Sequence, residues 1–323
     1  MNHIPIVDFK DCYDETLVGY RSNIEATGKL LLDALSTVGF VYLKNTPIKS
    51  DEIAAVNKVT EEIFHASSSE KNKFEWDAKR NFGYVSLTRE NVDPKKTDYK
   101  EAFNLGAEAL DGDMSLSWPH HLSSDFYKVM IDFSQTCKQL SHQVLRVLAI
   151  GMGLKDEDFF IKCHSKMHTG QNYTTLRSLY YPPVPKDLPV NQTRLGVHSD
   201  YGSLTLLFQD DVGGLQVENT QNEFVDAVPI EGTVVVNIGD ALESWTLGKL
   251  KSTKHKVIIP DDPSVRETVR RSLVYFVHPD HDTVINKPLV YANGDNAIEI
   301  KKTQKPITAF EHTRRKLDAS YTY

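Results

Sequence analysis

The chain has 323 residues, and 37 Lys and Arg against 44 Asp and Glu give it a formal net charge of −7. This length allows either two domains or a single barrel with added helices, and it is sufficient to bury a core without disulfides. The mild acidity argues against a nucleic-acid or anionic-membrane surface, which requires a basic face. Small-molecule chemistry remains open.

Three cysteines, Cys12, Cys137 and Cys163, lie far apart without a metal-type spacing. An odd number of separated thiols is typical of a protein in a reducing compartment. The N-terminal residues lack the apolar segment of a signal peptide. No apolar run approaches the roughly 18–20 residues that a transmembrane helix requires. We therefore expect a cytoplasmic protein without a membrane partner.

The first half of the chain has mainly helical patterns. The strongest covers residues 123–152, where apolar side chains recur every three or four positions and form one continuous stripe. Cys137 falls in this stripe, so we expect a helix that packs against a sheet and a cysteine that belongs to the core. Further helices are expected at 24–38 and 51–64, and short strands at 4–9 and 40–43.

From residue 176 onward the pattern changes to short apolar runs separated by turn residues. Many short strands at close spacing predict an antiparallel sandwich or barrel rather than alternating βα units. The sequence contains no Gly-x-Gly-x-x-Gly motif or phosphate-binding loop, so nothing supports nucleotide binding by those routes. The expected strands are 176–181, 203–208, 215–218, 224–228, 233–238, 255–259 and 272–277.

A histidine and an aspartate stand two positions apart at His198 and Asp200. In an extended segment both side chains project from the same face, so both can reach one metal ion. His255, at the start of an expected strand, can supply a third ligand. Two histidines and one carboxylate with open positions are the ligand set of oxygen-activating iron(II) enzymes. Alone, His-x-Asp is a weak signal, and the alternative is a surface histidine beside a turn aspartate.

Arg270 and Ser272 also stand two positions apart, where the strand after His255 opens. A guanidinium and a hydroxyl that converge on one point form a carboxylate clamp, and only arginine offers bidentate geometry. A metal ligand followed by such a clamp suits an organic acid that chelates the metal. The alternative for Arg270 is a solvated charge, which is the role expected of its neighbour Arg271.

The order of several short motifs resembles the iron(II)/2-oxoglutarate-dependent oxygenases of the isopenicillin N synthase-like superfamily, and the resemblance covers nearly the whole chain. The N-terminal motifs are Ile4-Pro5-Ile6-Val7-Asp8-Phe9, Gly39-Phe40-Val41-Tyr42-Leu43-Lys44-Asn45, Gly83-Tyr84 and Lys100-Glu101-Ala102-Phe103. The later motifs are Tyr180-Tyr181-Pro182-Pro183, His198-Ser199-Asp200-Tyr201-Gly202-Ser203-Leu204-Thr205, Gly213-Gly214-Leu215-Gln216-Val217, Val236-Asn237-Ile238-Gly239-Asp240, Lys251-Ser252-Thr253-Lys254-His255-Lys256-Val257 and Arg270-Arg271-Ser272.

This resemblance implies a mixed α and β fold, with a distorted double-stranded β-helix (jelly-roll) core flanked by helices. Residues 1–120 would form the N-terminal helical and strand region of the family. Residues 121–323 would form a backing helix, the Fe(II)/2-oxoglutarate jelly-roll core and a C-terminal helix. We expect the two regions to make one compact structural unit.

The resemblance also implies roles for individual residues. The family's iron ligands match His198, Asp200 and His255. The residues that hold the distal carboxylate of 2-oxoglutarate match Arg270 and Ser272, and Tyr181 matches a tyrosine that often assists them.

Candidate substrate residues are Arg177, Tyr201 and Phe276, which lie beside the expected ligand-bearing strands. The alternative for Arg177 is a salt bridge on the sheet surface, and the alternative for the two aromatic residues is an ordinary core position. Residues 81–106 are polar and predict irregular surface structure. That stretch and residues 309–323 are candidate lids, and Arg314, Arg315 and Lys316 are expected on a solvated helix face.

The expected activity is that of an Fe(II)- and 2-oxoglutarate-dependent dioxygenase. It would use O2 to oxidise, most simply to hydroxylate, a C–H bond of a small organic molecule, and it would release succinate and CO2. One alternative is an iron oxidase or cyclase of the isopenicillin N synthase type, which needs no 2-oxoglutarate. The other is a non-catalytic jelly-roll binding protein. We expect a monomer or weak homo-oligomer with no nucleic-acid partner.

Overall fold

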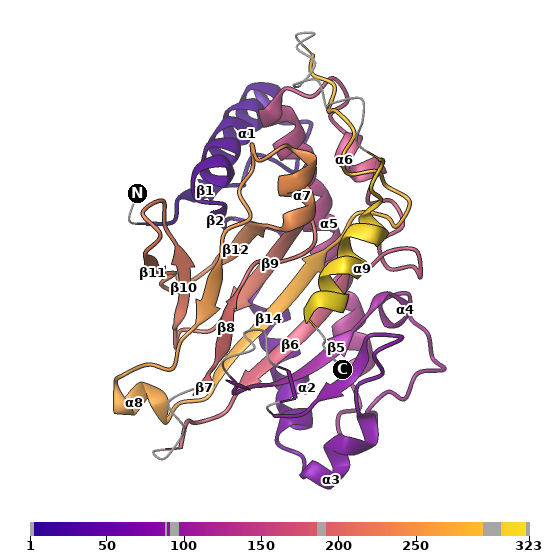
Figure 1. Cartoon of the computed structure of the whole chain (residues 1–323), viewed down its shortest axis with the longest axis vertical. Helices are drawn as coiled ribbons and strands as arrows, with labels where there is room; N and C mark the ends of the chain where they lie inside the picture. Colours follow the sequence, from indigo (N-terminus) through magenta and orange to yellow (C-terminus); the bar gives the residue numbers. More distant parts are fainter. Residues whose placement is uncertain (1–2, 88, 91–96, 186–191, 293–304, 321–323) are drawn as a thin grey trace.

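The structure is a computed structural model that describes residues 3–87, 89–90, 97–185, 192–292 and 305–320. Within these residues, two β-sheets form a jelly-roll, and the long helices pack against the larger sheet (Figure 1). The larger sheet has eight strands in the order β1-β2-β12-β9-β14-β6-β5-β3, and the smaller has four in the order β11-β10-β13-β8. A short pair, β4 and β7, forms a separate two-stranded sheet.

The strands are short, as the spacing of the apolar runs predicts. Those of the larger sheet are β1 (Ile6–Asp8), β2 (Phe40–Lys44), β3 (Phe82–Val85), β5 (Glu101–Leu105), β6 (Thr175–Tyr181), β9 (Leu204–Gln209), β12 (Thr233–Ile238) and β14 (Arg270–Val277). Those of the smaller sheet are β8 (Leu195–His198), β10 (Leu215–Glu218), β11 (Phe224–Asp226) and β13 (His255–Val257). The separate pair is β4 (Thr97–Asp98) and β7 (Gln192–Thr193).

Three long helices are α1 (Tyr20–Thr37), α2 (Ser50–Phe64) and α5 (Phe126–Met152). The apolar stripe of α5 is buried against the larger sheet, and Cys137 lies in it with no exposed surface, as expected. The short helices are α3 (Ser68–Lys71), η1 (Asn72–Phe74), α4 (Ala107–Leu110), α6 (Phe159–Lys162), α7 (Asp240–Trp245) and α8 (Pro263–Arg266), and α9 (Ala309–Ser320) follows near the C-terminus. None of the helices in the described residues is long and apolar enough to cross a membrane.

The strands of the larger sheet have two buried faces. On β14, Leu273 and Tyr275 pack toward the helices, whereas Val274 and Phe276 pack into the space between the two sheets. Successive side chains of a strand point to opposite faces, so Arg270 and Ser272 face the same inter-sheet space as Val274. A strand buried on both faces therefore carries its polar residues into the interior of the jelly-roll.

Strand register arranges the inward-facing residues in rows across the larger sheet. Asn237 and Phe276 both lie directly opposite Thr205, on either side of it. Two residues earlier on β14, Val274 lies opposite Arg177. At the beginning of β14, Arg270 lies opposite Tyr181. The polar residues that face the space between the sheets therefore lie in successive cross-strand rows, from Thr205 and Asn237 through Arg177 to Arg270.

The expectation of irregular surface structure over residues 81–106 is wrong for the described part of that range. Strands β3 and β5 pair with each other, and β5 joins β6 at the edge of the larger sheet. Their residues Phe82, Tyr84 and Phe103 are buried. The two strands are only four and five residues long, and polar sequence around them dilutes their apolar pattern. Residues 88 and 91–96 lie outside the described residues.

Candidate metal centre

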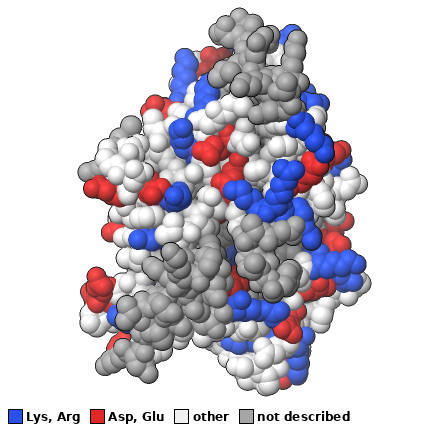
Figure 2. Space-filling view, viewed as in Figure 1, with Lys and Arg blue, Asp and Glu red and all other residues white. Residues whose placement is uncertain are grey.

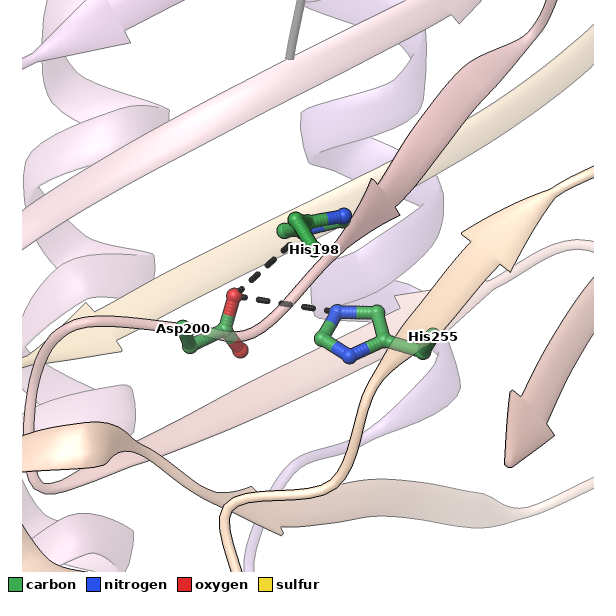
Figure 3. A group of neighbouring side chains, drawn as sticks. All are labelled: His198, Asp200 and His255. Carbon is green, nitrogen blue, oxygen red and sulfur yellow. Dashed lines mark ion pairs between the residues drawn. The ribbon is translucent and has the colours of Figure 1, made fainter. Parts of the chain in front are cut away.

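The side chains of His198, Asp200 and His255 converge on one point (Figure 3). His198 ends β8 and His255 begins β13, and the two residues are direct partners across the smaller sheet. Asp200 follows two positions after the end of β8. The Nε2 atom of each histidine lies 3.7 Å from Oδ1 of Asp200. One potential ligand atom from each residue lies within 4.8 Å of the others.

The hydrogen bonds of the two imidazoles fix which nitrogen faces the cluster. Nδ1 of His198 lies 2.9 Å from the carbonyl of Gly196, and Nδ1 of His255 lies 3.1 Å from the carbonyl of Thr253. A carbonyl only accepts, so Nδ1 of each ring donates away from the cluster, and Nε2 is the nitrogen that faces it. Three potential ligand atoms therefore face one another, which is the arrangement that a metal cation fits.

The electrostatics favour the protonation states that metal binding needs. Burial and the neighbouring His255 lower the pKa of His198 to about 4, so its imidazole is neutral near pH 7. Burial alone would raise the pKa of Asp200, but the two imidazoles and two hydrogen-bond donors outweigh it and hold that pKa below its ordinary value. Near pH 7, Asp200 is thus a carboxylate and His198 a neutral imidazole.

The two donors act on the other oxygen of Asp200. Thr205 Oγ1 donates to Oδ2 at 2.6 Å, and Asn237 Nδ2 donates to the same atom at 2.7 Å. Both donors come from the larger sheet, where Thr205 and Asn237 are direct partners. Oδ2 is therefore occupied, and Oδ1 is left facing the two histidines.

Arg270 is buried at the beginning of β14, with 1 % of its surface exposed. Its Nε donates to the carbonyl of Gly213 at 2.7 Å, and its Nη1 lies 3.4 Å from Oγ of Ser272. The guanidinium carbon lies 4.9 Å from the centre of the Tyr181 ring. The structure therefore brings together the three residues expected to form a carboxylate site. A buried guanidinium requires an anion or strong acceptors, and within the described residues this one is hydrogen-bonded to one backbone carbonyl and one hydroxyl.

The candidate substrate residues differ in placement. Phe276 faces the inter-sheet space opposite Thr205, which is bonded to Asp200, so this ring lies next to the metal centre. Arg177 faces the same space opposite Val274 and forms an ion pair with Glu90, so the salt bridge exists but lies inside the jelly-roll rather than on the sheet surface. Tyr201 directly follows Asp200 and is half-buried.

The sequence falls into a known family in both of its halves. The 2OG-Fe(II) oxygenase superfamily model matches residues 167–279, and the model of the non-haem dioxygenase in morphine synthesis N-terminal region matches residues 4–124. The 2-oxoglutarate-dependent dioxygenase htyE of Aspergillus rugulosus is 34% identical, over 79% of this chain and 82% of its own length. The chain belongs to the 2OG-Fe(II) oxygenase superfamily. It is an Fe(II)- and 2-oxoglutarate-dependent oxygenase.

Other similar proteins cover almost the whole oxygenase. Proline hydroxylase buaE of Petromyces alliaceus is 31% identical over 92% of this chain and 94% of the relative. The crystal structure of a full-length Neurospora crassa protein in complex with alpha-KG and thymine superimposes with a TM-score of 0.82 and 33% identity, covering 98% of this chain and 97% of that one. The expected jelly-roll, the enzyme class and the cofactors Fe(II), 2-oxoglutarate and O2 are thereby confirmed. The names of these relatives indicate different substrates.

Some polar residues of the oxygenase interior were not singled out from the sequence. Thr205 and Asn237 stand inside the quoted motifs, but nothing in the pattern shows that they meet at Asp200. Strand β8 was also missing from the expected strands, because Gly196 and Arg194 interrupt its apolar run. The third omission is a buried ion cluster of Glu90, Lys100 and Asp98.

The C-terminal helix of the oxygenase differs slightly from expectation. Arg314, Arg315 and Lys316 are exposed, as expected, but Lys316 also pairs with a carboxylate of α7, since its Nζ lies 2.7 Å from Oδ2 of Asp240. Arg271, expected to be solvated, is half-buried and donates to Glu61 at 2.5 Å. Residues 321–323 of the candidate C-terminal lid lie outside the described residues.

Proposed function

We propose that His198, Asp200 and His255 are the iron ligands of this oxygenase. The observation that carries the proposal is the meeting of two imidazole Nε2 atoms and one carboxylate oxygen within 4.8 Å of one another. Two imidazoles and one carboxylate are the facial ligand set of non-haem iron(II) oxygenases. Thr205 and Asn237 support this set by holding the second oxygen of Asp200 away from it.

We propose that Arg270 and Ser272 bind the distal carboxylate of 2-oxoglutarate and that Tyr181 lines this end of the site. Support comes from the burial of Arg270 and from its contacts with both other residues. Gly213 accepts from Nε of Arg270 and so fixes the plane of the guanidinium. The remaining guanidinium edge can pair with a carboxylate in the bidentate geometry that arginine favours.

The substrate is proposed to be a small polar molecule that lies against Phe276 and contacts Arg177, with Tyr201 at the same end of the site. Support comes from the position of Phe276 beside the residues that hold Asp200, and from the inward orientation of Arg177. Arg177, Glu90, Lys100 and Asp98 form an ion-pair network at this place, so polar groups are available to the substrate. Thymine, a polar molecule present in the Neurospora complex, is the first candidate.

When bound, iron and 2-oxoglutarate supply the activation of O2 and the removal of hydrogen from a C–H bond, with release of succinate and CO2. The chain's own residues orient the reactants. Arg270 and Ser272 set the direction of the cosubstrate, and Phe276 presents an apolar face that excludes water from the substrate's side. Thr205 and Asn237 keep Asp200 from rotating, so that Oδ1 is the oxygen that it would offer to a bound metal.

We also propose that the protein works in the cytoplasm as a monomer or weak homo-oligomer, without a nucleic-acid or membrane partner. Three free thiols support a reducing compartment. Basic and acidic side chains are interspersed among the described residues of the face seen in Figure 2, so this face offers no continuous basic surface to a polyanion.

Substitution of the proposed ligands tests the assignment. His198→Ala should weaken Fe(II) binding by at least about 100-fold, because a ligand is lost rather than a supporting group.

Arg270→Lys should leave Fe(II) binding unchanged but raise the KM for 2-oxoglutarate roughly 10-fold to 100-fold, because lysine keeps the charge and loses the bidentate geometry of the guanidinium. Anaerobic metal titration and steady-state kinetics measure the two effects.

The exposed His120 provides a matched control, since His120→Ala removes an imidazole without touching the cluster. Wild-type metal affinity in His198→Ala, or loss of it in His120→Ala alone, would contradict the ligand assignment. An unchanged KM for 2-oxoglutarate in Arg270→Lys would contradict the carboxylate site.

A further inference from the structure

A continuous chain of buried polar contacts joins the candidate substrate residue Arg177 to the histidine His198. Arg177 pairs with Glu90, and Nζ of Lys100 lies 3.6 Å from the same carboxylate oxygen of Glu90. Lys100 Nζ also donates to Oδ2 of Asp98 at 2.8 Å. Glu90, Lys100 and Asp98 all precede the jelly-roll core in sequence.

This series of polar contacts continues from Asp98 into strand β8. Oδ1 of Asp98 accepts from the backbone N–H of Gly196 at 2.8 Å, and the carbonyl of Gly196 accepts from Nδ1 of His198 at 2.9 Å. Asp98 therefore uses one oxygen to hold Lys100 and the other to hold the residue that orients the imidazole. The partner of a histidine's second nitrogen fixes the tautomer and the ring orientation of a metal ligand.

Burial makes each link of this chain costly to break. The exposed fractions are 0 % for the side chain of Asp98, 4 % for Lys100 and 8 % for Glu90. Burial alone would raise the pKa of Glu90, but Arg177 and Lys100 outweigh it and keep that pKa below its ordinary value. Loss of one partner weakens the compensation of a buried charge, and neighbouring groups must rearrange in response.

We propose that Asp98 and Lys100 are positioning residues for His198, and that Glu90 links them to Arg177, so that the substrate pocket and the metal centre respond to each other. This inference rests on the proposed roles of His198 and Arg177. A substrate that binds Arg177 weakens the ion pair between Arg177 and Glu90. Glu90 then interacts more strongly with Lys100, and this shifts Asp98 and the hydrogen bond that orients the imidazole of His198. Residues outside the jelly-roll core would then help to tune its metal site.

The test uses Co(II) as the probe, titrated into the full chain without substrate. Asp98→Asn keeps the shape and removes the charge that holds Lys100, and we expect its Co(II) affinity to fall about 10-fold with an altered visible spectrum. Glu90→Gln should lower the affinity in the same direction, though by less, from the far end of the chain. When Asp98→Asn and Glu90→Gln are combined, the loss of Co(II)-binding free energy should be smaller than the sum of the two single losses, because both changes act on the same series of contacts.

Lys71→Met is the matched control. Lys71 and Glu101 form another largely buried ion pair, 2.6 Å apart, that does not belong to the series of contacts from Arg177 to His198. The substitution should cost stability but leave Co(II) affinity and spectrum unchanged. Should Asp98→Asn fail to fold, Asp98→Asn combined with Lys100→Met removes both charges and tests the same link.

The failures of the two proposals can be told apart. If His198→Ala loses Co(II) while Asp98→Asn and Glu90→Gln both bind it with wild-type affinity and spectrum, the metal centre stands and the positioning role is overturned. If His198→Ala itself binds Co(II) like the wild type, the ligand assignment is wrong, and the positioning role that rests on it is wrong as well. A loss in Lys71→Met equal to that in Asp98→Asn would also overturn the inference, since it would reflect stability alone.

Discussion

Two histidines outside the metal cluster, His164 and His168, are buried and neutral near pH 7. Nδ1 of His164 lies 2.6 Å from the carbonyl of Phe160, and its Nε2 lies 2.8 Å from the hydroxyl of Ser203. Nε2 of His168 lies 2.6 Å from the hydroxyl of Tyr275. Burial lowers the pKa of His164 to about 4 and that of His168 to about 3. These residues hold the jelly-roll together as neutral hydrogen-bonding groups rather than as charges.

Their buried neutral state predicts a loss of stability in acid. Below pH about 6.5 the unfolded chain binds protons at these histidines while the folded chain does not until pH about 4, so the free energy of unfolding falls as pH falls through this window. Each histidine adds a slope of about 1 kcal/mol per pH unit there. Above that window the slope is absent.

Urea unfolding of the wild type and His168→Gln at pH 7, 6 and 5 measures this contribution. The variant should be less stable at pH 7 but should lose stability less steeply toward pH 5. Equal slopes in the two proteins would contradict the assignment, and His120→Gln, at an exposed position, serves as the control.

At this scale the sequence singled out the proposed metal and cosubstrate residues, but not the residues that support them. The i, i+2 spacing of His198 and Asp200, and of Arg270 and Ser272, predicts side chains on one face of an extended segment, and the structure brings each pair together. Asn237 and Asp98 reach the site from segments 37 residues after Asp200 and 98 residues before Gly196, through pairings that no local pattern encodes.

Helices α1 and α5 cross in unusually close contact at two glycines. A Cβ atom on Gly151 would lie 2.1 Å from the carbonyl oxygen of Gly28, and one on Gly28 would lie 2.8 Å from the carbonyl oxygen of Val147. Atoms at such distances overlap, and both obstacles are backbone. The crossing therefore depends on the absence of side chains at this point, and it sets the distance of α1 from the helix that backs the sheet.

Gly151→Ala should destabilise the protein by about 1–3 kcal/mol, because the overlap forces the helices apart and outweighs the better helix propensity of alanine. Gly170→Ala is the matched control, since a Cβ there meets nothing within 4 Å. Thermal unfolding of both variants measures the effect. Equal melting temperatures for Gly151→Ala and the wild type would show that the crossing is looser than the structure has it.

Elements with a long or regular pattern were predicted within a few residues of their observed ends. Helix α5 was expected over 123–152 and spans Phe126–Met152, because a 27-residue apolar stripe leaves little ambiguity. Strands β3 and β5 were missed, because a strand of four or five residues at a sheet edge carries too few alternations to stand out. Their burial depends on β6, which comes 70 residues later than the end of β5.

At the scale of the whole molecule, both parts of the sequence contribute to one sheet. Strands β2 and β5, from the first 120 residues, pair with β12 and β6 of the core. This arrangement supports the proposal that residues 1–120 and 121–323 form one unit. The same arrangement brings Lys100 and Asp98 against β8, so the N-terminal region borders the metal centre.

Oxygen consumption and succinate release, measured together on the full chain, test the central claim most directly. The reaction contains Fe(II) and 2-oxoglutarate, with and without thymine, and His198→Ala is run in parallel. We predict that succinate forms in step with the O2 consumed, that both stop when 2-oxoglutarate or iron is removed, and that both are lost in His198→Ala. O2 consumption that oxidises an organic substrate without forming succinate would contradict the account and would indicate an oxidase of the isopenicillin N synthase type.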